Sequence, residues 1–210
     1  MREALDVGAI RAAAHDWRVD VVEETGSTNA DLLARAAAGE DIAGAVLLAE
    51  YQTAGRGRHD RQWSAPPRAQ VAMSVGVDTT GIPTDTWGWL PLLTGVAAVE
   101  TLREYVDAGL KWPNDVMVGA GKLGGVLSEV ANAGVVVVGI GINVSLTADE
   151  LPDPRATSLE LLGATVDRTE LASNLLRALA SRVHHWRAAS GADGDLVDDY
   201  KRYSLTLGTP

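Results

Sequence analysis

The apolar and polar positions of the chain recur with two periods, one typical of helices and one typical of strands. The helical period, together with strong helix formers, predicts helices over 3–15, 30–37, 86–106, 169–190 and 193–203. Apolar runs and alternation predict strands over 18–24, 45–51, 70–77, 110–112, 115–118, 122–130 and 134–142. The strands cluster without regular βαβ alternation. The order therefore favours an α+β fold, with a mixed, largely antiparallel sheet and helices packed on one face.

The helix expected over 30–37 carries signals at both of its ends. Ser27 precedes it and is predicted as the N-cap, because a serine hydroxyl accepts a hydrogen bond from a free N–H of the first turn. Gly39 follows it and is predicted to end it. Residues 145–157 are rich in Pro and Asp and are predicted to form a loop.

A glycine-rich basic loop is expected between two of the buried strands, where residues 52–63 read QTAGRGRHDRQW. The chain has a formal net charge of −10, yet Arg56, Arg58 and Arg61 stand close together here. Glycines let the backbone N–H groups approach an anion, and arginine adds planar, bidentate donors. A flexible basic loop that touches nucleic acid is the alternative. Because no wider basic stripe accompanies the loop, a small anionic ligand is favoured and nucleic acid is not expected as a partner.

A second polar cluster lies in residues 111–129, which read KWPNDVMVGAGKLGGVLSE. Pro113 fixes its own φ and favours an extended residue before it, so Asn114 and Asp115 are expected at a defined corner. Lys122 opens the next apolar strand, and a lysine there can reach an anion without being buried. A hairpin with solvated lysines would explain this stretch equally well on its own.

Two nucleotide-binding patterns are absent. The segment GIGINV at 139–144 lacks the third glycine of a dinucleotide fingerprint, and no helix is expected to open there. The pair at 121–122 lacks the earlier glycine and the following Ser or Thr of a P-loop. A bound nucleotide must therefore be held by a different binding motif.

Taken together, these segments resemble the biotin protein ligases. The resemblance rests on ETGSTN at 24–29, the glycine-arginine loop at 55–63, KWPND at 111–115, KLGG at 122–125 and GIGIN at 139–143, in the family's order. It covers about residues 20–145 and continues more weakly to Gly208. It implies the catalytic domain of these ligases, whose fold is related to that of class II aminoacyl-tRNA synthetases.

The resemblance also implies a two-step reaction. Biotin and MgATP, bound as substrates with no tightly bound prosthetic group, give biotinyl-5′-AMP and pyrophosphate. The ε-amine of a lysine on the biotin carboxyl carrier domain of an acyl-CoA or pyruvate carboxylase then attacks the mixed anhydride and releases AMP. No protein nucleophile is required, in keeping with the absence of cysteine.

Carried over motif by motif, the resemblance assigns roles to individual residues and leaves metal ligands unassigned. Lys122 and Arg58 are expected to bridge the carboxylate and the phosphate and to stabilise the transition state. The residues expected to bind biotin are Ser27, Thr28, Asn29, Gln52, Gly55, Arg56, Gly57, Arg58, Lys122, Gly125, Gly139 and Gly141, the last three leaving room for the valeryl chain. The residues expected on the nucleotide side are Arg58, Arg61, Trp63, Lys111, Asn114, Asp115 and Asn143, with Asp115 near magnesium or the acceptor lysine.

Composition excludes several other classes of protein. The 210 residues contain no cysteine and four histidines, which argues against disulfide frameworks and structural zinc sites. The longest apolar stretch, 134–142, is too short to span a membrane. Acidic residues near the N-terminus do not fit a signal peptide. A cytoplasmic protein without a membrane partner, either a monomer or a weak homodimer, is expected.

The chain departs from the family pattern in two places. His59-Asp60 stands where Arg-Gly or His-Gly is usual, and Asp60 is expected to weaken retention of the adenylate. The C-terminus ends where family members continue into a small SH3-like domain, so one catalytic domain over 1–210 is expected, with that domain absent or truncated after about 205. The residues before the first strand are too few for a DNA-binding winged helix.

Two other functions stay open. A lipoate or octanoate ligase or transferase would share the fold and the lysine but would not need this glycine-arginine loop. The alternative from another functional class is a truncated, catalytically weak module that binds biotinyl-adenylate, which would apply if the missing domain were indispensable.

Overall fold

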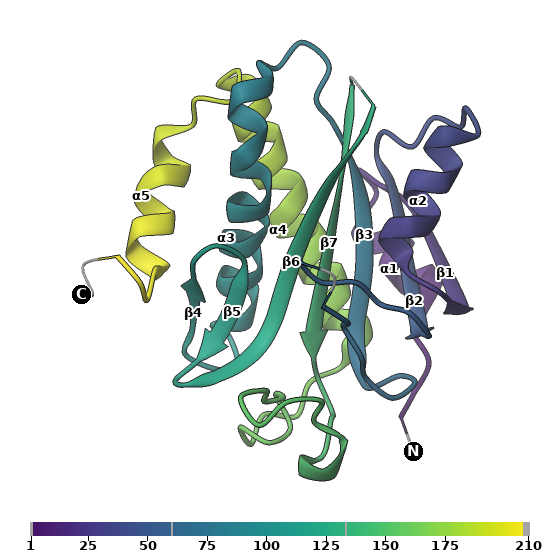
Figure 1. Ribbon diagram of the computed structural model, residues 1–210, viewed down its shortest axis with the longest axis vertical. Helices are drawn as coiled ribbons and strands as arrows, with labels where there is room; N and C mark the ends of the chain where they lie inside the picture. The colour runs from purple at the N-terminus through teal and green to yellow at the C-terminus, as the bar shows by residue number, and fades with distance from the viewer. Residues whose placement is uncertain (1, 60, 133, 208–210) are drawn as a thin grey trace.

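A single seven-stranded sheet forms the centre of the structure, a computed structural model that describes residues 2–59, 61–132 and 134–207 (Figure 1). The strands are β1 (Arg18–Thr25), β2 (Ala45–Gln52), β3 (Gln70–Asp78), β4 (Ala108–Lys111), β5 (Asp115–Val118), β6 (Gly121–Asn132) and β7 (Val135–Asn143). Their order across the sheet is β1-β2-β3-β7-β6-β5-β4. Only β1 and β2 pair in parallel, and the other neighbours are antiparallel. The predicted mixed, largely antiparallel sheet is confirmed.

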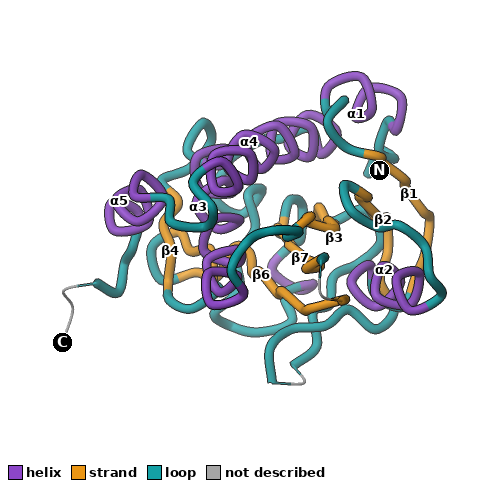
Figure 2. Tube along the Cα trace, turned by 90° about the horizontal axis from the view of Figure 1, so that it is seen from above, coloured by secondary structure: helices purple, strands orange, loops and turns teal. Residues whose placement is uncertain are grey.

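Helices cover both faces of this sheet. They are α1 (Val7–Ala13), α2 (Thr28–Ala37), α3 (Leu90–Leu102), α4 (Arg168–Ala188) and α5 (Gly194–Tyr203), with the 3₁₀ helices η1 (Thr84–Trp89) and η2 (Ala148–Glu150). The helices α1, α3, α4 and α5 share one apolar core on one face, as expected. The helix α2 lies on the opposite face (Figure 2), where Leu32 packs with Leu47 and Val137. One-sided packing is therefore wrong for α2, because β2 and β7 are apolar on both faces and need cover on both.

The predicted element ends differ from the structure where local chemistry intervenes. The expected helix over 86–106 divides into η1 and α3, because Pro91 suits the first turn of a new α-helix. The expected helix over 3–15 begins only at Val7, since the Asp6 carboxylate caps it by accepting from the Ala9 N–H. Ser27 caps α2 as predicted, and Gly39 follows with a φ of +88°.

A buried ion pair ties the N-terminal segment to the sheet and to α4. The Arg168 Nη2 lies 2.6 Å from the Glu50 Oε2, with the two side chains 8% and 3% exposed. Arg168 also donates to the carbonyls of Gln70 and Glu3. The second oxygen of Glu50 accepts from the Leu5 N–H at 2.6 Å. Both carboxylate oxygens and both terminal guanidinium nitrogens are thereby hydrogen-bonded, as buried charges require.

None of the helices in the described residues combines the length and the apolar character needed to cross a bilayer.

Candidate functional site

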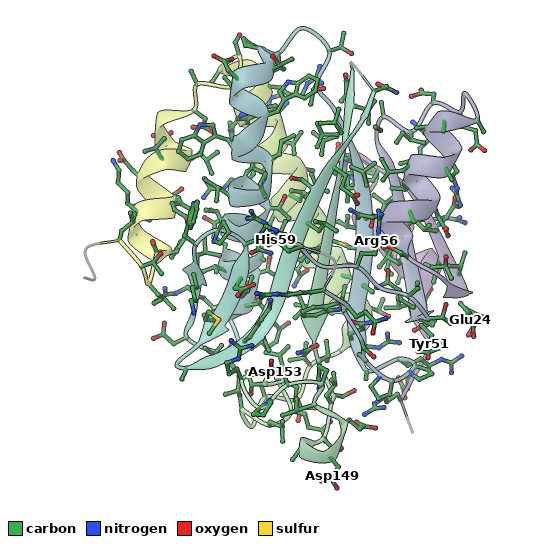
Figure 3. The ribbon with its side chains drawn as sticks, viewed as in Figure 1. Glu24, Tyr51, Arg56, His59, Asp149 and Asp153 are labelled. Carbon is green, nitrogen blue, oxygen red and sulfur yellow. The ribbon has the colours of Figure 1, made fainter. Side chains whose placement is uncertain are left out.

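A cavity of about 820 Å³ opens on the sheet between α2, the loop after β2 and the loop after β7. Of the residues predicted for the site, all but Gly55 line this cavity. In Figure 3 the labelled Arg56 and His59 lie over the middle of the sheet, and Asp153 lies towards its lower end. Segments distant in sequence therefore converge on one volume. Their individual roles remain predictions.

One end of the cavity is a polar cluster at the start of α2. The Gln52 Oε1 accepts from the backbone N–H of Thr28 at 2.9 Å and from its hydroxyl at 3.2 Å. The Ser27 hydroxyl accepts from the Ala30 N–H as the N-cap. These groups are buried from solvent at the N-terminus of a helix, where donors and acceptors can meet a compact polar ligand group.

The three glycines expected to leave room for an aliphatic chain differ in what lies above them. A Cβ at Gly139 would overlap the amide of Asn29, and one at Gly141 would overlap the indole of Trp63. At Gly125 the nearest atoms would be the Cε and Nζ of Lys122, both at 3.5 Å, an ordinary contact distance. Gly139 and Gly141 thus let neighbouring site residues pack against the sheet, whereas at Gly125 a Cβ would meet its neighbours at ordinary contact distances.

The glycine-arginine loop folds as a small hairpin. Gly57 donates to the Arg61 carbonyl at 2.7 Å, and Trp63 donates to the Gly55 carbonyl at 2.8 Å. A Cβ at Gly55 would collide with the Trp63 carbonyl, so this buried glycine shapes the base of the hairpin rather than the cavity wall. Asp60, predicted to weaken adenylate retention, lies outside the described residues.

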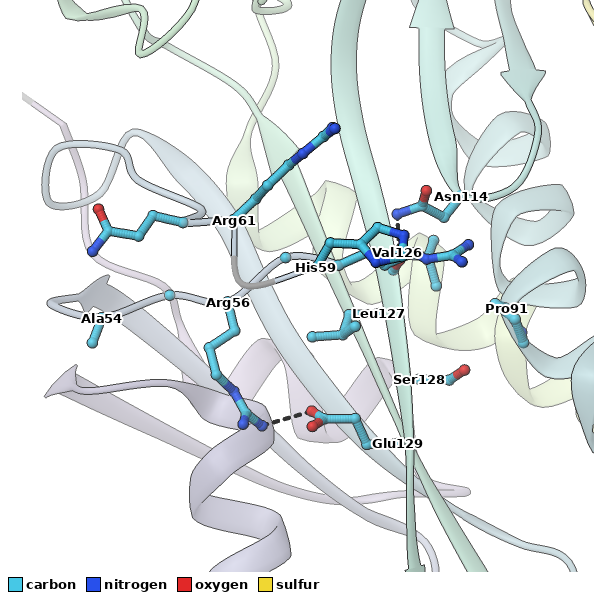
Figure 4. A pocket seen from close by; sticks show the side chains of 14 residues that line it. Ala54, Arg56, His59, Arg61, Pro91, Asn114, Val126, Leu127, Ser128 and Glu129 are labelled. Carbon is cyan, nitrogen blue, oxygen red and sulfur yellow. Dashed lines mark hydrogen bonds and ion pairs between the residues drawn. The ribbon is translucent and has the colours of Figure 1, made fainter.

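The cations of the loop have different partners. Arg56 pairs with Glu129, its Nη2 lying 2.6 Å from the Oε2. Arg58 and Arg61 are exposed and form no ion pair with any residue that the structure describes. A second cavity of about 700 Å³ lies against the same loop, with Asn114 and the segment 126–129 on its other wall (Figure 4). Two exposed guanidinium groups therefore border both cavities.

Lys122 is fixed at the centre of the larger cavity. Its Nζ lies 2.6 Å from the Asp115 Oδ1 and 5.7 Å from the centre of the Trp63 ring. Its backbone is bonded to the loop after β7, donating to the Arg155 carbonyl and accepting from the Thr157 N–H. The Trp63 indole in turn donates to the Gln70 Oε1 at 2.5 Å. The ammonium group is thus held by its neighbours.

The residues predicted for the nucleotide side line the wall around Lys122. Asn114 donates to the Val126 carbonyl and Asn143 to the Thr157 carbonyl, both at 2.9 Å. The Asn143 Oδ1 is buried and has no hydrogen-bond partner among the described residues. An unsatisfied buried acceptor costs free energy, so this oxygen favours a ligand with an N–H donor. Lys111 is exposed at the rim of the cavity.

The sequence predictions did not include several polar residues that line one of the two cavities, four of which are Ser74, Glu129, Asp153 and Arg155. Ser74 is a hydroxyl within an otherwise apolar strand, and Glu129 is an acid near the end of one. Asp153 and Arg155 lie in the loop after β7, where a bidentate hydrogen bond from the Arg155 guanidinium holds the pKa of Asp153 well below its ordinary value. The polar interruption of an apolar run was the only signal available for Ser74 and Glu129.

Among the described residues, no group of three or more His, Asp or Glu side chains is arranged to hold a metal ion. Magnesium commonly binds through one or two carboxylates together with substrate phosphates. Asp115 and Asp153 are the carboxylates that line the larger cavity, so the residues present suit a Mg²⁺ ion that arrives with a nucleotide.

Comparison with known proteins agrees with this geometry. The model of the biotin/lipoate A/B protein ligase family matches residues 22–146. The biotin–(acetyl-CoA-carboxylase) ligase of Mycobacterium tuberculosis is 49% identical over an alignment of 220 residues including gaps, which covers 100% of this chain and 81% of that relative. The bifunctional ligase/repressor BirA of Escherichia coli is 34% identical over 77% of this chain, which spans 52% of that protein's length.

Solved structures share the fold. The biotin protein ligase from Aquifex aeolicus in complex with biotin and ATP superposes with a TM-score of 0.78 at 29% identity, covering 91% of this chain and 80% of that one. The ligase from Leishmania major in complex with biotinyl-5-AMP, at 23% identity, supports the fold alone, with a TM-score of 0.70 and coverage of 92% and 85%. From its matched family model and its full-length similarity to a curated ligase, the chain belongs to the biotin/lipoate A/B protein ligase family.

Proposed function

We propose that the protein is an ATP-dependent biotin–protein ligase, which forms biotinyl-5′-AMP and transfers biotin to a lysine of a carboxylase carrier domain. The observation that carries the proposal is the cavity around Lys122, which joins a polar cluster at α2 to the exposed arginines of the loop. A ligand with a polar ring at one end, an apolar chain and an anionic group at the other end fits this order of side chains.

The charges of the site suit the first step. A carboxylate oxygen of biotin must attack the α-phosphorus of ATP, while the bond to the β-phosphate oxygen breaks and pyrophosphate leaves. Both reactants are anionic, so Lys122 and Arg58 offset their repulsion and stabilise the charge that develops on the phosphoryl oxygens. Arg61 adds a third cation, and binding both substrates in one cavity replaces an encounter in solution.

The nucleotide side has groups for the adenine. The unpartnered Asn143 Oδ1 is an acceptor for the exocyclic amine, and Trp63 offers a flat face beside Lys122. Mg²⁺ enters with ATP as part of the substrate and neutralises phosphate charge, with Asp115 as the protein carboxylate beside it. In the second step the acceptor amine attacks the carbonyl carbon, the C–O bond of the anhydride breaks, and AMP leaves with the excess proton lost to solvent.

The acceptor is proposed to be the biotin carrier domain of an acyl-CoA or pyruvate carboxylase. The name of the Mycobacterium tuberculosis relative supports an acetyl-CoA carboxylase in particular. A single catalytic domain over 1–210, a cytoplasmic location and a monomer or weak homodimer complete the proposal.

The direct test is incubation of the protein with biotin, MgATP and an apo carrier domain, followed by mass spectrometry of that domain. A mass increase of one biotinyl group on one lysine is expected. Omission of ATP and replacement of the acceptor lysine by arginine are the controls. A carrier domain that stays unmodified, while pyrophosphate is released, would favour the adenylate-binding module instead.

Ligand choice separates this function from lipoate or octanoate chemistry. Biotin is expected to bind roughly 10²-fold or more tightly than either fatty acid, because the cluster of Thr28 and Gln52 would lose its hydrogen bonds to a ligand without a ureido ring. Titration calorimetry of the three ligands measures the difference. Equal or tighter binding of lipoate would reject the biotin assignment.

Ligand binding is also expected to protect the glycine-arginine loop. Arg58 and Arg61 are exposed cations without partners among the described residues, and biotinyl-AMP supplies the missing anion. Tryptic cleavage after these two arginines should slow when biotin and MgATP are both present, while cleavage after Arg202 on α5 serves as the reference. A cleavage rate unaffected by substrates would contradict loop ordering. An Asp60→Gly variant that gains no further protection would contradict the penalty assigned to Asp60.

A further inference from the structure

Glu129 lies near the end of β6, outside the segments that resemble the ligase motifs, yet its carboxylate joins two residues of the site. Its Oε2 accepts from the Asn29 Nδ2 at 2.9 Å and pairs with the Arg56 Nη2 at 2.6 Å. Figure 4 shows Arg56 and Glu129 pointing toward each other across the smaller cavity. One charged oxygen therefore contacts both the glycine-arginine loop and the polar cluster at α2.

This carboxylate determines which way the Asn29 amide points. The Asn29 Nδ2 donates to Glu129 and also to the Leu127 carbonyl at 3.3 Å. Both partners can only accept hydrogen bonds, so the amide nitrogen has to face them. The Asn29 Oδ1 consequently faces Ser74, whose buried hydroxyl donates to it at 2.6 Å.

The orientation of the Asn29 amide also determines the direction of the hydrogen bond between Ser74 and Thr28. Its Oγ1 lies 2.7 Å from the Ser74 Oγ and 3.2 Å from the Gln52 Oε1. The one hydrogen of the Ser74 hydroxyl is already given to Asn29, so Thr28 is the donor in this contact and shares its single hydroxyl hydrogen between the Ser74 Oγ and the Gln52 Oε1. Both hydroxyl hydrogens are thereby used within the network. What Ser74 and Thr28 offer to the cavity is lone pairs, while the engaged Oε1 of Gln52 leaves its amide nitrogen as a donor.

We propose that Glu129 is a positioning residue that sets this direction of hydrogen bonding and thereby the preference of the site for a ligand with N–H donors. The inference rests on the proposed function, since the ureido ring of biotin carries two N–H donors and one carbonyl acceptor. With the amide of Asn29 reversed, the Ser74 hydroxyl would turn its hydrogen outward and meet those N–H groups as a second donor. A neutral residue at 129 removes the charge that opposes this reversal.

The kinetic test is Glu129→Gln, measured by pyrophosphate release. The KM for biotin is expected to rise about tenfold, the usual effect of losing one hydrogen bond to a charged group. The KM for ATP and kcat should change by less than about threefold, because Lys122 and the nucleotide side lose no hydrogen bond. Glu129→Asp, which retains the charge, should recover part of the loss. The matched control is Glu104→Gln, which neutralises an exposed carboxylate that lines neither cavity. Parallel loss of kcat, of both KM values and of thermal stability would overturn the inference in favour of a merely structural role.

A double-mutant cycle separates the path through Asn29 from the path through Arg56. If Glu129 acts through the hydroxyl network, adding Glu129→Gln to Ser74→Ala should raise the KM for biotin by less than about threefold, far short of additivity. Full additivity would show that Glu129 acts only by holding Arg56, and would reject the inference.

A measurement on the ligand-free protein keeps this inference distinct from the proposed function. The side-chain amide resonances of Asn29, assigned by NMR with the help of an Asn29→Asp variant, should shift in Glu129→Gln and stay in place in Glu104→Gln. Unchanged resonances would refute the network whether or not the protein turns over biotin. Shifted resonances in a native protein that neither binds nor activates biotin would reject the ligase function and leave the role of Glu129 in orienting Asn29 intact.

Discussion

Replacing Lys122 by alanine is expected to slow biotinyl-adenylate formation by about 10²–10³-fold, the typical loss for one preorganised donor at a developing charge. The ammonium group is already in position, 2.6 Å from Asp115 and beside the Trp63 ring, so substrate binding need not recruit it. Biotin binding should weaken much less, since the polar cluster at α2 is unaffected. Single-turnover pyrophosphate release, with calorimetry of biotin binding, measures the two effects separately.

Two companion variants define what Lys122 does. Lys111→Ala removes a cation at the rim of the same cavity and should have a smaller effect on this step. Asp115→Asn combined with Lys122→Ala tests whether the lysine only neutralises the aspartate, because that double variant would then be as active as Asp115→Asn alone. Near-native pyrophosphate release by Lys122→Ala, or a double variant as active as Asp115→Asn alone, would exclude a direct role at the phosphate.

Replacing Arg168 by methionine is expected to destabilise the fold by about 3–5 kcal/mol, because it leaves the carboxylate of Glu50 buried without its partner. The loss also frees the Gln70 and Glu3 carbonyls that Arg168 now satisfies. Denaturant unfolding at neutral pH gives the free energy of unfolding, and the midpoint should fall at unchanged slope.

The matched control is Lys201→Met, which breaks an exposed helix pair with Asp198 and should cost no more than about 0.5 kcal/mol. Adding Glu50→Gln to Arg168→Met should recover part of the loss, since it removes the uncompensated charge. A midpoint for Arg168→Met equal to that of the control would mean that the buried pair contributes nothing to stability.

Local chemistry made much of this fold predictable from sequence. Ser27 and Gly39 delimit α2 through interactions within a few residues, and apolar alternation places the strands to within a few positions. The side of the sheet that α2 covers was not predictable in this way, because β2 and β7 are apolar on both faces and accept a helix on either. The division at Pro91 was visible in the sequence but was outweighed there by the long apolar run around it.

The site shows the same limit. Lys122, Arg58 and the cluster at α2 were found because they stand in recognisable segments, and the structure brings those segments to one cavity. Glu129 was missed because its two partners, Asn29 and Arg56, are 100 and 73 residues away in sequence. A lone acid in a strand predicts an exposed side chain. Only the tertiary fold brings the Asn29 amide and the Arg56 guanidinium into contact with it.

The continuous strand β6 carries both ends of the site, with Lys122 near its start and Glu129 seven residues further on. At about 3.3 Å per residue, the backbone fixes their separation at roughly 23 Å. Side chains alternate between the two faces of a strand, and seven is an odd number, so the register shift between Gly124 and Lys122 is what brings Lys122 to the same face as Glu129. Inserting or deleting one residue between them would send one end of the site to the wrong side of the sheet. The length of β6 between Lys122 and Glu129 therefore limits the length of a ligand that can occupy both ends of the site.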